Sequence, residues 1–419
     1  GSRAQEGRAP VTNAMTKRPL QADQRVEEHD MKVAVILPNY NHAAFIAQAL
    51  EGILSQTYQN WQLWIVDDGS TDDSWAIIER YRDRDARIVA ERFPRNRGIL
   101  AAVPRLFELC SGDLLCAAAA DDYISNPRYF EFAVAALQRF PQAAAAFARA
   151  ELVDGDHDDR PLGSMGCYLP TRGARAAVKD DATGVLMQFI PPREALTRFV
   201  SHHMFIPGCS VIWRRACMPE FDILDEALGP QGDYFYFHAL AALHGAVFID
   251  TPVVVARVSE KTYNGTATDE DYFRRHALVE KKLRALALPY ATDERLWGQF
   301  RTATIASRTA EFHQRRLFKT LRGFCDSVPP SELQMFPPES AAFVARMQDE
   351  CARLETRLNS QIEWARQIFN EVAGPAESLP LGCESGPRPW LRPVAEFFLS
   401  LGKILGKTFT GLGNWLWQV

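Results

Sequence analysis

Three groups of polar residues follow short apolar runs in the first third of the chain. Asn39, Tyr40 and Asn41 follow the first run, Asp67 and Asp68 the second, and the pair Asp121-Asp122 follows L-L-C-A-A-A-A. Carboxylates can bind a divalent cation, or accept hydrogen bonds from a nucleobase or a sugar. A run of small apolar residues suits a strand buried on both faces, so adjacent acids at its end indicate a functional site.

Alternating apolar runs predict the elements that position these side chains. The predicted strands are residues 32–38, 61–66, 87–91 and 114–120, and the predicted helices are residues 43–54, 70–81 and 98–110. Strands and helices at this spacing indicate an open, mostly parallel sheet with helices on both faces. Ligands bind outside the carboxyl ends of such strands, so we expect the polar groups to gather at one edge.

The motifs at these strand ends resemble those of a known enzyme family. V-A-V-I-L-P-N-Y-N, I-V-D-D-G-S-T-D-D-S, N-R-G and A-D-D together resemble family 2 glycosyltransferases with the GT-A fold, closely over residues 31–122 and more loosely to about 258. The resemblance implies an α/β, GT-A type (Rossmann-like) sheet, followed by a helical C-terminal extension. It also implies transfer of a sugar from a nucleotide-sugar donor to an acceptor hydroxyl.

The same resemblance implies a set of nucleotide-binding residues. They are Pro38, Tyr40, Asn41, Asp67, Asp68, Asn96, Arg97 and Ala120. A carboxylate such as that of Asp68 only accepts hydrogen bonds, which suits the imide N–H of uracil. A UDP-sugar is therefore the expected donor. The two aspartates at 67 and 68 could alternatively only cap the next helix.

The resemblance further implies a divalent cation, Mn²⁺ or Mg²⁺, bound by Asp121 and Asp122. The family pattern begins with another acid, and this chain has Ala119 there. Magnesium commonly uses one or two protein carboxylates together with phosphates and water, so the remaining acids can suffice. The alternative for both aspartates is a solvated turn.

The expected general base is Asp233, in G-D-Y at the start of a predicted helix. A base there would take the proton of the acceptor hydroxyl, and direct displacement would invert the anomeric centre. The resemblance also places His202, His203 and Arg257 near the acceptor or phosphate. Their alternatives are structural histidines and an ordinary salt bridge, and Asp233 could be only a helix cap.

Composition limits the class of partner and the compartment. A net charge of −5 gives no reason to expect nucleic acid. The eight cysteines form no C-x-x-C pair, which indicates neither a zinc site nor a disulfide framework. No apolar stretch is long enough to span a bilayer. We expect a cytoplasmic protein, peripheral on the cytoplasmic face of the inner membrane.

The remaining chain is expected to form additions to residues 31–262, the GT-A domain. These additions are a disordered tail (1–30), a helical extension (263–338), a coiled-coil-like helix (339–373), a linker (374–389) and an amphipathic helix (390–419). The heptad-like seam of residues 344–372 could form a homo-oligomer or pack on its own domain. The amphipathic helix could lie in a membrane interface or bury against protein.

Three functions remain open from the sequence. The first is an active, metal-dependent, inverting glycosyltransferase of surface polysaccharide or glycolipid synthesis, acting on a glycan, glycolipid or protein acceptor. The second is a degenerate domain that binds nucleotide-sugar or glycan without transfer, which Ala119 favours. The third is a scaffold in which the C-terminal helices carry the function.

Overall fold

The structure is a computed structural model of the 419-residue chain. It describes residues 30–155, 158–166, 177–202, 206–218, 225, 227–229, 232–259, 268–286, 288–305, 308 and 363–374. The predicted tail before residue 30, most of the predicted extension beyond residue 305, and the amphipathic helix of residues 390–419 lie outside these ranges.

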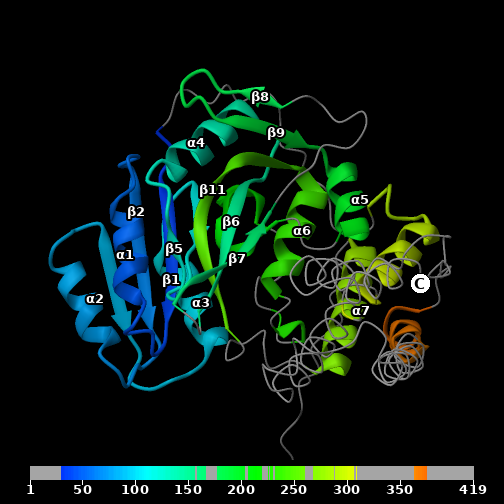
Figure 1. Cartoon of the computed structure of the whole chain (residues 1–419), viewed down its shortest axis with the longest axis horizontal. Helices are drawn as coiled ribbons and strands as arrows, with labels where there is room; N and C mark the ends of the chain where they lie inside the picture. The colour runs from blue at the N-terminus through cyan, green and yellow to red at the C-terminus, as the bar shows by residue number, and fades with distance from the viewer. Residues whose placement is uncertain are drawn as a thin grey trace, which may run out of the picture.

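The first part of the described chain alternates strands with helices. Its elements are β1 (Val33–Asn39), α1 (Ile46–Leu54), β2 (Trp61–Asp67), α2 (Ser74–Arg82), β3 (Ile88–Arg92), α3 (Ile99–Leu109) and β4 (Leu114–Ala117). The strands pair in parallel in the order β3-β2-β1-β4, so their carboxyl ends share one edge (Figure 1). The βαβ prediction is confirmed, but β4 ends at Ala117 and not at Ala120.

The second part extends the same sheet. Its elements are β5 (Tyr123–Ile124), α4 (Tyr129–Arg139), β6 (Ala145–Asp154), β7 (Arg160–Met165), β8 (Val178–Lys179), β9 (Leu186–Ile190), α5 (Pro192–His202), η1 (Gly208–Ser210), β10 (Val211–Arg214), η2 (Arg215–Cys217), α6 (Gly232–His244), β11 (Ala246–Val258) and α7 (Asp269–Ala285). The order continues β4-β10-β6-β11-β9-β8. Strand β10 is antiparallel to both neighbours, whereas β6 and β11 are parallel to each other. The central strands thus run mostly in one direction, which confirms the expected fold class.

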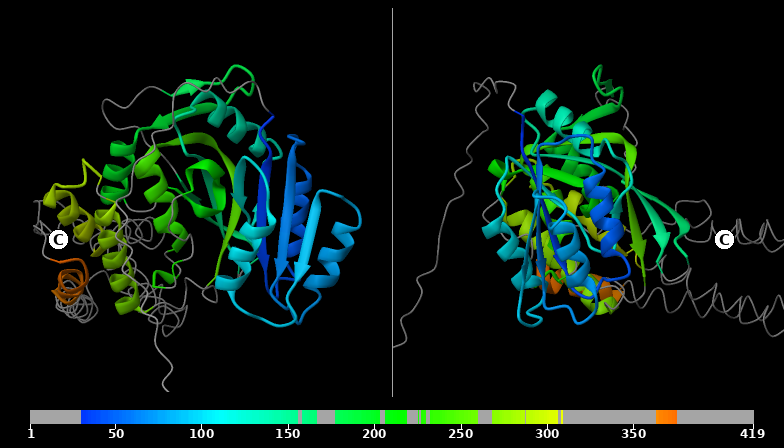
Figure 2. Two further views of the ribbon diagram at one scale, coloured as in Figure 1. Left: turned by 180° about the vertical axis from the view of Figure 1, so that it is seen from behind. Right: turned by 90° about the vertical axis from the view of Figure 1, so that its left-hand side faces the viewer.

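Helices cover both faces of this sheet, and each face has its own apolar core. One core contains residues of α1, α2 and α4, and the other contains residues of α3, α5, α6 and α7. Figure 2 shows these two layers on either side of the sheet. The near-continuous apolar character of β1 and β2 follows, because strands covered on both sides bury both sets of side chains.

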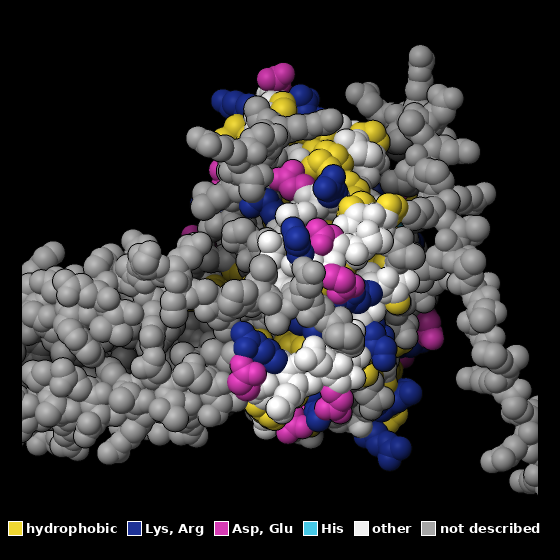
Figure 3. All heavy atoms as spheres, turned by 90° about the vertical axis from the view of Figure 1, so that its right-hand side faces the viewer, with side chains coloured by type: hydrophobic (Ala, Val, Ile, Leu, Met, Phe, Trp, Pro, Cys, Tyr) yellow, Lys and Arg dark blue, Asp and Glu magenta, His cyan; other side chains and the backbone are white. Residues whose placement is uncertain are grey.

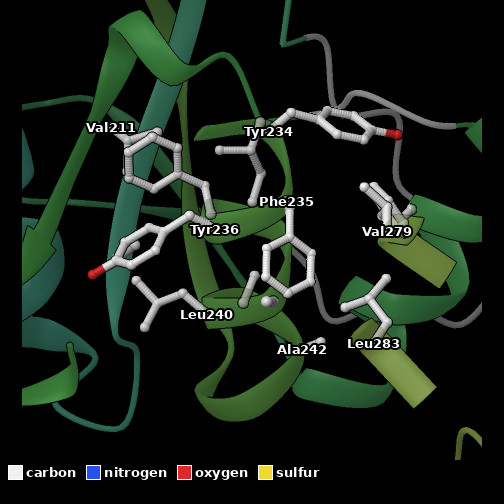
Figure 4. Packing of buried hydrophobic residues seen from close by; sticks show 14 of the residues in the cluster. Val211, Tyr234, Phe235, Tyr236, Leu240, Ala242, Val279 and Leu283 are labelled. Carbon is white, nitrogen blue, oxygen red and sulfur yellow. The ribbon is translucent and has the colours of Figure 1, made fainter. Parts of the chain in front are cut away.

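Helix α6 lies inside the core that also contains residues of α3, α5 and α7, and it has no polar face. Its residues from Tyr234 to Ala242 are all buried, and a helix without a polar face requires partners on every side. The ring of Tyr236 contacts that of Trp213 in β10, with centroids 6.3 Å apart. Phe235 points the other way, toward Val279 and Leu283 of α7 (Figure 4). The first turn of α6 is thereby fixed between the sheet and the helical layer.

A segment far along the chain completes this core. Residues 363–373 form a helix, and its Ala365, Ile368 and Phe369 are buried in the same cluster as α7. The fully buried Glu280 of α7 pairs with Arg301, whose guanidinium also donates to the Gly374 carbonyl oxygen at 2.7 Å. In the described part of the heptad-like stretch, the seam therefore packs on its own chain, one of the two arrangements that the sequence left open.

The outer face of the helical layer carries charges of both signs. Figure 3 shows Lys and Arg side chains interspersed with Asp and Glu over the described residues of this face. Several form pairs along or between helices, such as Arg274 with Glu270 and Arg284 with Glu294. Among the described helices, none is both long and apolar enough to cross a membrane.

Candidate active site

The carboxyl ends of β1 and β2 are joined by Asp67. Its buried carboxylate accepts hydrogen bonds from Asn39 Nδ2 at 2.8 Å and from the Ser70 hydroxyl at 2.6 Å. The backbone N–H of Ser70 donates to it as well, and Arg92 Nε of β3 lies 3.3 Å away. Asp67 therefore links the carboxyl ends of β1, β2 and β3 and stabilises this edge of the sheet.

Asp68 is fixed against the loop that precedes α3. Its two carboxylate oxygens accept the backbone N–H groups of Arg97 and Gly98, each at 2.7 Å. The turn also needs Gly69, because its φ is +72° and an added Cβ would lie 2.5 Å from the Arg95 carbonyl carbon. Each carboxylate oxygen has two acceptor sites, so Asp68 keeps capacity for a ligand donor.

The remaining predicted nucleotide residues lie around these two turns. Asn41, with φ 57°, accepts the Thr71 N–H at 2.8 Å, and Tyr40 beside it is 39% exposed. Asn96 is exposed on the N-R-G loop, and the Arg97 guanidinium stacks on the Phe93 ring at 4.6 Å. Pro38 lies within β1, and Ala120 is 3% exposed. The structure thus brings the turns after β1 and β2 together, without testing ligand contact.

The second acid pair lies on the loop between β4 and β5. The Asp121 carboxylate has no hydrogen-bond or salt-bridge partner among the described residues, whereas Asp122 Oδ1 accepts the Arg257 backbone N–H at 2.9 Å. Burial and the neighbouring charge of Asp121 raise the pKa of Asp122 to about 7. A cation shared by the two side chains would favour the ionised form of Asp122.

Asp233 occupies the first turn of α6, as the sequence predicts. The side chain is exposed, and its Oδ1 accepts the Tyr234 N–H at 2.7 Å. The surrounding protein mass desolvates the carboxylate and raises its pKa, while that N–H acts in the opposite direction. A carboxyl of raised pKa is a better proton acceptor, which is the property of a general base.

Gly208 is a site residue that sequence reasoning missed. It begins η1, and a Cβ built on it would lie only 2.6 Å from Asp233 Oδ2. Its backbone has no left-handed φ, so the requirement for glycine comes from the carboxylate beside it. The G-C-S segment of the sequence gave no signal of this, because Gly208 and Asp233 are neighbours only in the folded chain.

Cys209, also missed from the sequence, follows Gly208 directly. Burial raises the pKa of its thiol well above the usual value, and the negative charges of Asp122, Asp233 and Asp121 add to the effect. Cys209 and Asp122 both line the same small, open pocket. Because Gly208 lies beside Asp233 and the next residue, Cys209, lines a pocket with Asp122, the acids of the β4–β5 loop and of α6 belong to the same part of the molecule.

The three residues predicted near acceptor or phosphate have separate outcomes. His202 is the last residue of α5, and its side chain lies outside the described set, as does the whole of His203. Arg257 in β11 is described, and its side chain is only 6% exposed. Its guanidinium pairs with Asp159 at 2.6 Å and donates to the Asp121 carbonyl oxygen at 2.6 Å.

The residues present fit a divalent cation that is bound by one or two carboxylates better than a cation that is coordinated by protein side chains alone. No cluster of three or more His, Cys, Asp or Glu side chains able to hold a metal occurs among the described residues. The unpartnered Asp121 carboxylate beside Asp122 gives one or two oxygen ligands, which matches magnesium-type sites completed by substrate phosphates. The metal assignment of the two aspartates remains a prediction.

The sequence matches a described protein family over much of the sheet. Residues 34–218 match the family model described as Glycosyl transferase family 2. An uncharacterized glycosyltransferase of Nostoc is 29% identical over 191 residues, which cover 44% of this chain and 56% of that protein. The hyaluronan synthase of Streptococcus pyogenes is 34% identical over 102 residues, covering 23% of this chain and 24% of the synthase. The matches thus span about a quarter to just over half of these relatives.

Solved structures of low sequence identity are also similar to the chain. S. aureus TarS 1-349 in complex with UDP-GlcNAc is 17% identical, with a TM-score of 0.48, over 82% of this chain and 90% of that one. The mannosyltransferase PcManGT from Pyrobaculum calidifontis, in complex with GDP-Man and Mn²⁺, is 15% identical. Its TM-score is 0.43 over 81% of this chain and 86% of the mannosyltransferase.

Proposed function

Because residues 34–218 belong to glycosyl transferase family 2, we propose that this protein transfers a sugar from a UDP-sugar to an acceptor hydroxyl with inversion. The observation that carries this proposal is the placement of Asp233. Its carboxylate is exposed, has a raised pKa and lies beside Gly208, and the next residue, Cys209, lines a pocket with Asp122.

Asp233 acts as the general base in this proposal. It accepts the proton of the acceptor hydroxyl while that oxygen forms a bond to the anomeric carbon. The bond from the anomeric carbon to the diphosphate oxygen breaks, and its electron pair leaves with the nucleoside diphosphate. A single displacement of this kind inverts the configuration at the anomeric carbon.

Asp68, Asp121 and Asp122 bind the donor in this proposal. Asp68 accepts the imide N–H of uracil in addition to the two backbone N–H groups that fix it. Asp121 and Asp122 would hold Mn²⁺ or Mg²⁺, which when bound neutralises charge on the leaving diphosphate. We assign no donor-binding role to Asp67, because its carboxylate already contacts Asn39, Ser70 and Arg92.

A binding titration tests the donor side of the proposal. UDP, dTDP, GDP and CMP are titrated with and without Mn²⁺ into the wild type, Asp121→Ala and a matched control, Asp181→Ala. Asp181 is exposed in the turn after β8. We expect UDP to bind, Mn²⁺ to strengthen the binding, and only Asp121→Ala to lose that gain. If no nucleotide binds under any condition, the proposal is wrong.

The second candidate is a degenerate domain that binds a sugar nucleotide without transferring the sugar. Ala119 in place of the first acid favours it. Turnover of the UDP-sugar that binds separates the two functions. Transfer that is lost in Asp233→Asn, with UDP binding retained, supports the enzyme. Binding without any turnover in the presence of acceptor extracts supports the second candidate.

The proposal includes an acceptor of the surface polysaccharide or glycolipid type and a site of action at the cytoplasmic face of the membrane. The similarity to a hyaluronan synthase supports a polysaccharide product, and the amphipathic pattern of residues 390–419 supports the location. Truncation after Gly374 tests it without removing the buried Phe369. We expect the truncated protein to leave the membrane fraction and keep UDP binding, and retention in that fraction would contradict the location.

A further inference from the structure

Arg257 connects five parts of the structure through one side chain. Its Nε and Nη2 donate to the two carboxylate oxygens of Asp159, at 2.8 and 2.6 Å, on the turn between β6 and β7. Nη2 also donates to Gln48 of α1 at 2.7 Å. The guanidinium lies over the rings of Phe45 and Tyr123, at 4.8 and 5.3 Å.

Two further contacts reach the acid pair itself. Nη1 donates to the carbonyl oxygen of Asp121 at 2.6 Å, and the backbone N–H of Arg257 donates to Asp122 Oδ1 at 2.9 Å. Each guanidinium nitrogen thus has at least one partner inside the protein. A side chain that is 6% exposed and engaged in this way has little left to offer an incoming phosphate.

We propose that Arg257 is a positioning residue, held by Asp159, that fixes the backbone of Asp121 and one carboxylate oxygen of Asp122 so that the pair can bind a divalent cation. The loop between β4 and β5 needs such support, because β5, the strand at its end, pairs with β11 over two residues only, within the part of the chain that the structure describes. This inference rests on the proposed function in naming a cation as the ligand of the pair.

The contacts at position 257 require the planar, forked guanidinium group of arginine. It pairs with a carboxylate through two parallel N–H groups and still directs another N–H elsewhere. A lysine keeps the charge but is a point donor that cannot hold Asp159 and the Asp121 carbonyl together. The turn carrying Asp159 is also docked closely, since Gly155 N–H donates to the Val258 carbonyl at 3.0 Å and a Cβ on Gly155 would lie 3.2 Å from Arg257 Cβ.

The first test measures UDP binding with and without Mn²⁺ in Arg257→Lys and Asp159→Asn. Loss of a partner that orients metal ligands typically weakens metal affinity on the order of 10-fold to 100-fold. We therefore expect the Mn²⁺-dependent gain to fall about tenfold or more in Arg257→Lys and to fall in Asp159→Asn too, with metal-free UDP affinity unchanged. Arg160→Gln is the matched control, because Arg160 follows Asp159 directly at the start of β7 and pairs with Asp154.

A direct phosphate contact predicts the opposite pattern. Lysine also binds phosphate, so Arg257→Lys would keep most of the affinity, and Asp159→Asn would leave the Mn²⁺-dependent gain at the wild-type value. That combination would overturn the proposal. A fall of metal-free UDP affinity in Arg257→Lys, without any change in uridine binding, would overturn it as well.

A second measurement keeps the inference testable if the wild type binds no UDP. Hydrogen exchange of the backbone amides of residues 118–124 reports directly on the support of this loop. We expect faster exchange there in Arg257→Lys and Asp159→Asn, and unchanged exchange in Arg160→Gln. Unchanged exchange in all three variants would refute the positioning role, whereas absent UDP binding alone would refute only the proposed donor.

Discussion

The contact between Gly208 and Asp233 allows the position of the proposed general base to be tested by a single methyl group. In Gly208→Ala the new Cβ would lie 2.6 Å from Asp233 Oδ2, and ordinary contact begins at 3.4 Å. One of the two atoms must therefore move by about 3.4 − 2.6 = 0.8 Å. The next atoms, Asp233 Cγ at 3.5 Å and Phe237 Cε2 at 3.6 Å, are already at ordinary distances, so the carboxylate oxygen is the atom displaced.

The expected consequence is a loss in kcat with little change in donor binding. A misplacement of about 1 Å can cost on the order of 100-fold in rate, which corresponds to about 2.7 kcal/mol of transition-state stabilisation. The folded state should lose little, because Gly208 has no left-handed φ. The assay is steady-state sugar transfer for kcat and KM, with UDP affinity by titration and thermal unfolding of the same preparations.

A double-mutant cycle identifies the cause of that loss. In an Asp233→Asn background the base is already absent, so adding Gly208→Ala should lower the residual rate no further. Wild-type kcat in Gly208→Ala would refute the reasoning. An equal loss in both backgrounds would do the same, because it would show that the methyl group acts on something other than the carboxylate of Asp233.

Three further predictions concern Asp233, Glu280 and Gly69. Because the folded-state pKa of Asp233 is raised, ionisation destabilises the native state at pH values above the unfolded value of 3.8. Asp233→Asn should therefore match the wild-type Tm near pH 3 and exceed it increasingly toward pH 7, and equal values throughout would contradict the raised pKa of the Asp233 carboxyl. Glu280→Gln leaves Arg301 buried without its carboxylate partner, so urea unfolding should show a loss of about 3–5 kcal/mol. A loss below about 1 kcal/mol would show that Arg301 is not held by this pair. Gly69→Ala should abolish UDP binding and lower Tm, because its φ is +72° and Arg95 backbone atoms leave no room for a Cβ; wild-type UDP affinity would show that the turn can shift.

The strand-end residues were predictable because local patterns define them. The apolar run of β2 ends at Asp67, and the helix that follows begins within a few residues, so the edge of the sheet is readable from the chain. Asp233 was predictable on the same ground, as an acid in the first turn of a helix. Their contacts with nucleotide or acceptor remain predictions.

The predicted end of β4, at Ala120, was wrong for a physical reason. In the run Ala117–Ala120 every side chain is equally small, so nothing in the sequence marks where the strand leaves the sheet. In the structure the ladder with β1 ends at the pair Ile36 and Ala117. The chain then turns so that Tyr123 and Ile124 can pair with β11, a partner more than a hundred residues away.

The supporting residues were missed because only the folded chain brings them to the site. Gly208, Cys209 and Asp159 belong to short turns whose sequences have no period and no motif. Their importance comes from the residues beside them in the fold: Asp233 beside Gly208, Asp122 in the pocket that Cys209 lines, and Arg257 paired with Asp159. The local pattern of a single sequence does not indicate which distant turns will lie next to each other in the folded chain.

The helix of residues 363–373 has a consequence for the order in which the protein forms during synthesis. Arg301 and Gly374, which are hydrogen-bonded, are separated by 73 positions. At about 5–20 residues per second, a ribosome takes roughly 4–15 s to cover that stretch. During this interval the surface that will receive Phe369 on Phe300 is uncovered. The core that contains α7 therefore closes only after residue 374 has been synthesised, and nascent chains that stop short of Gly374 present an apolar surface to chaperones and proteases.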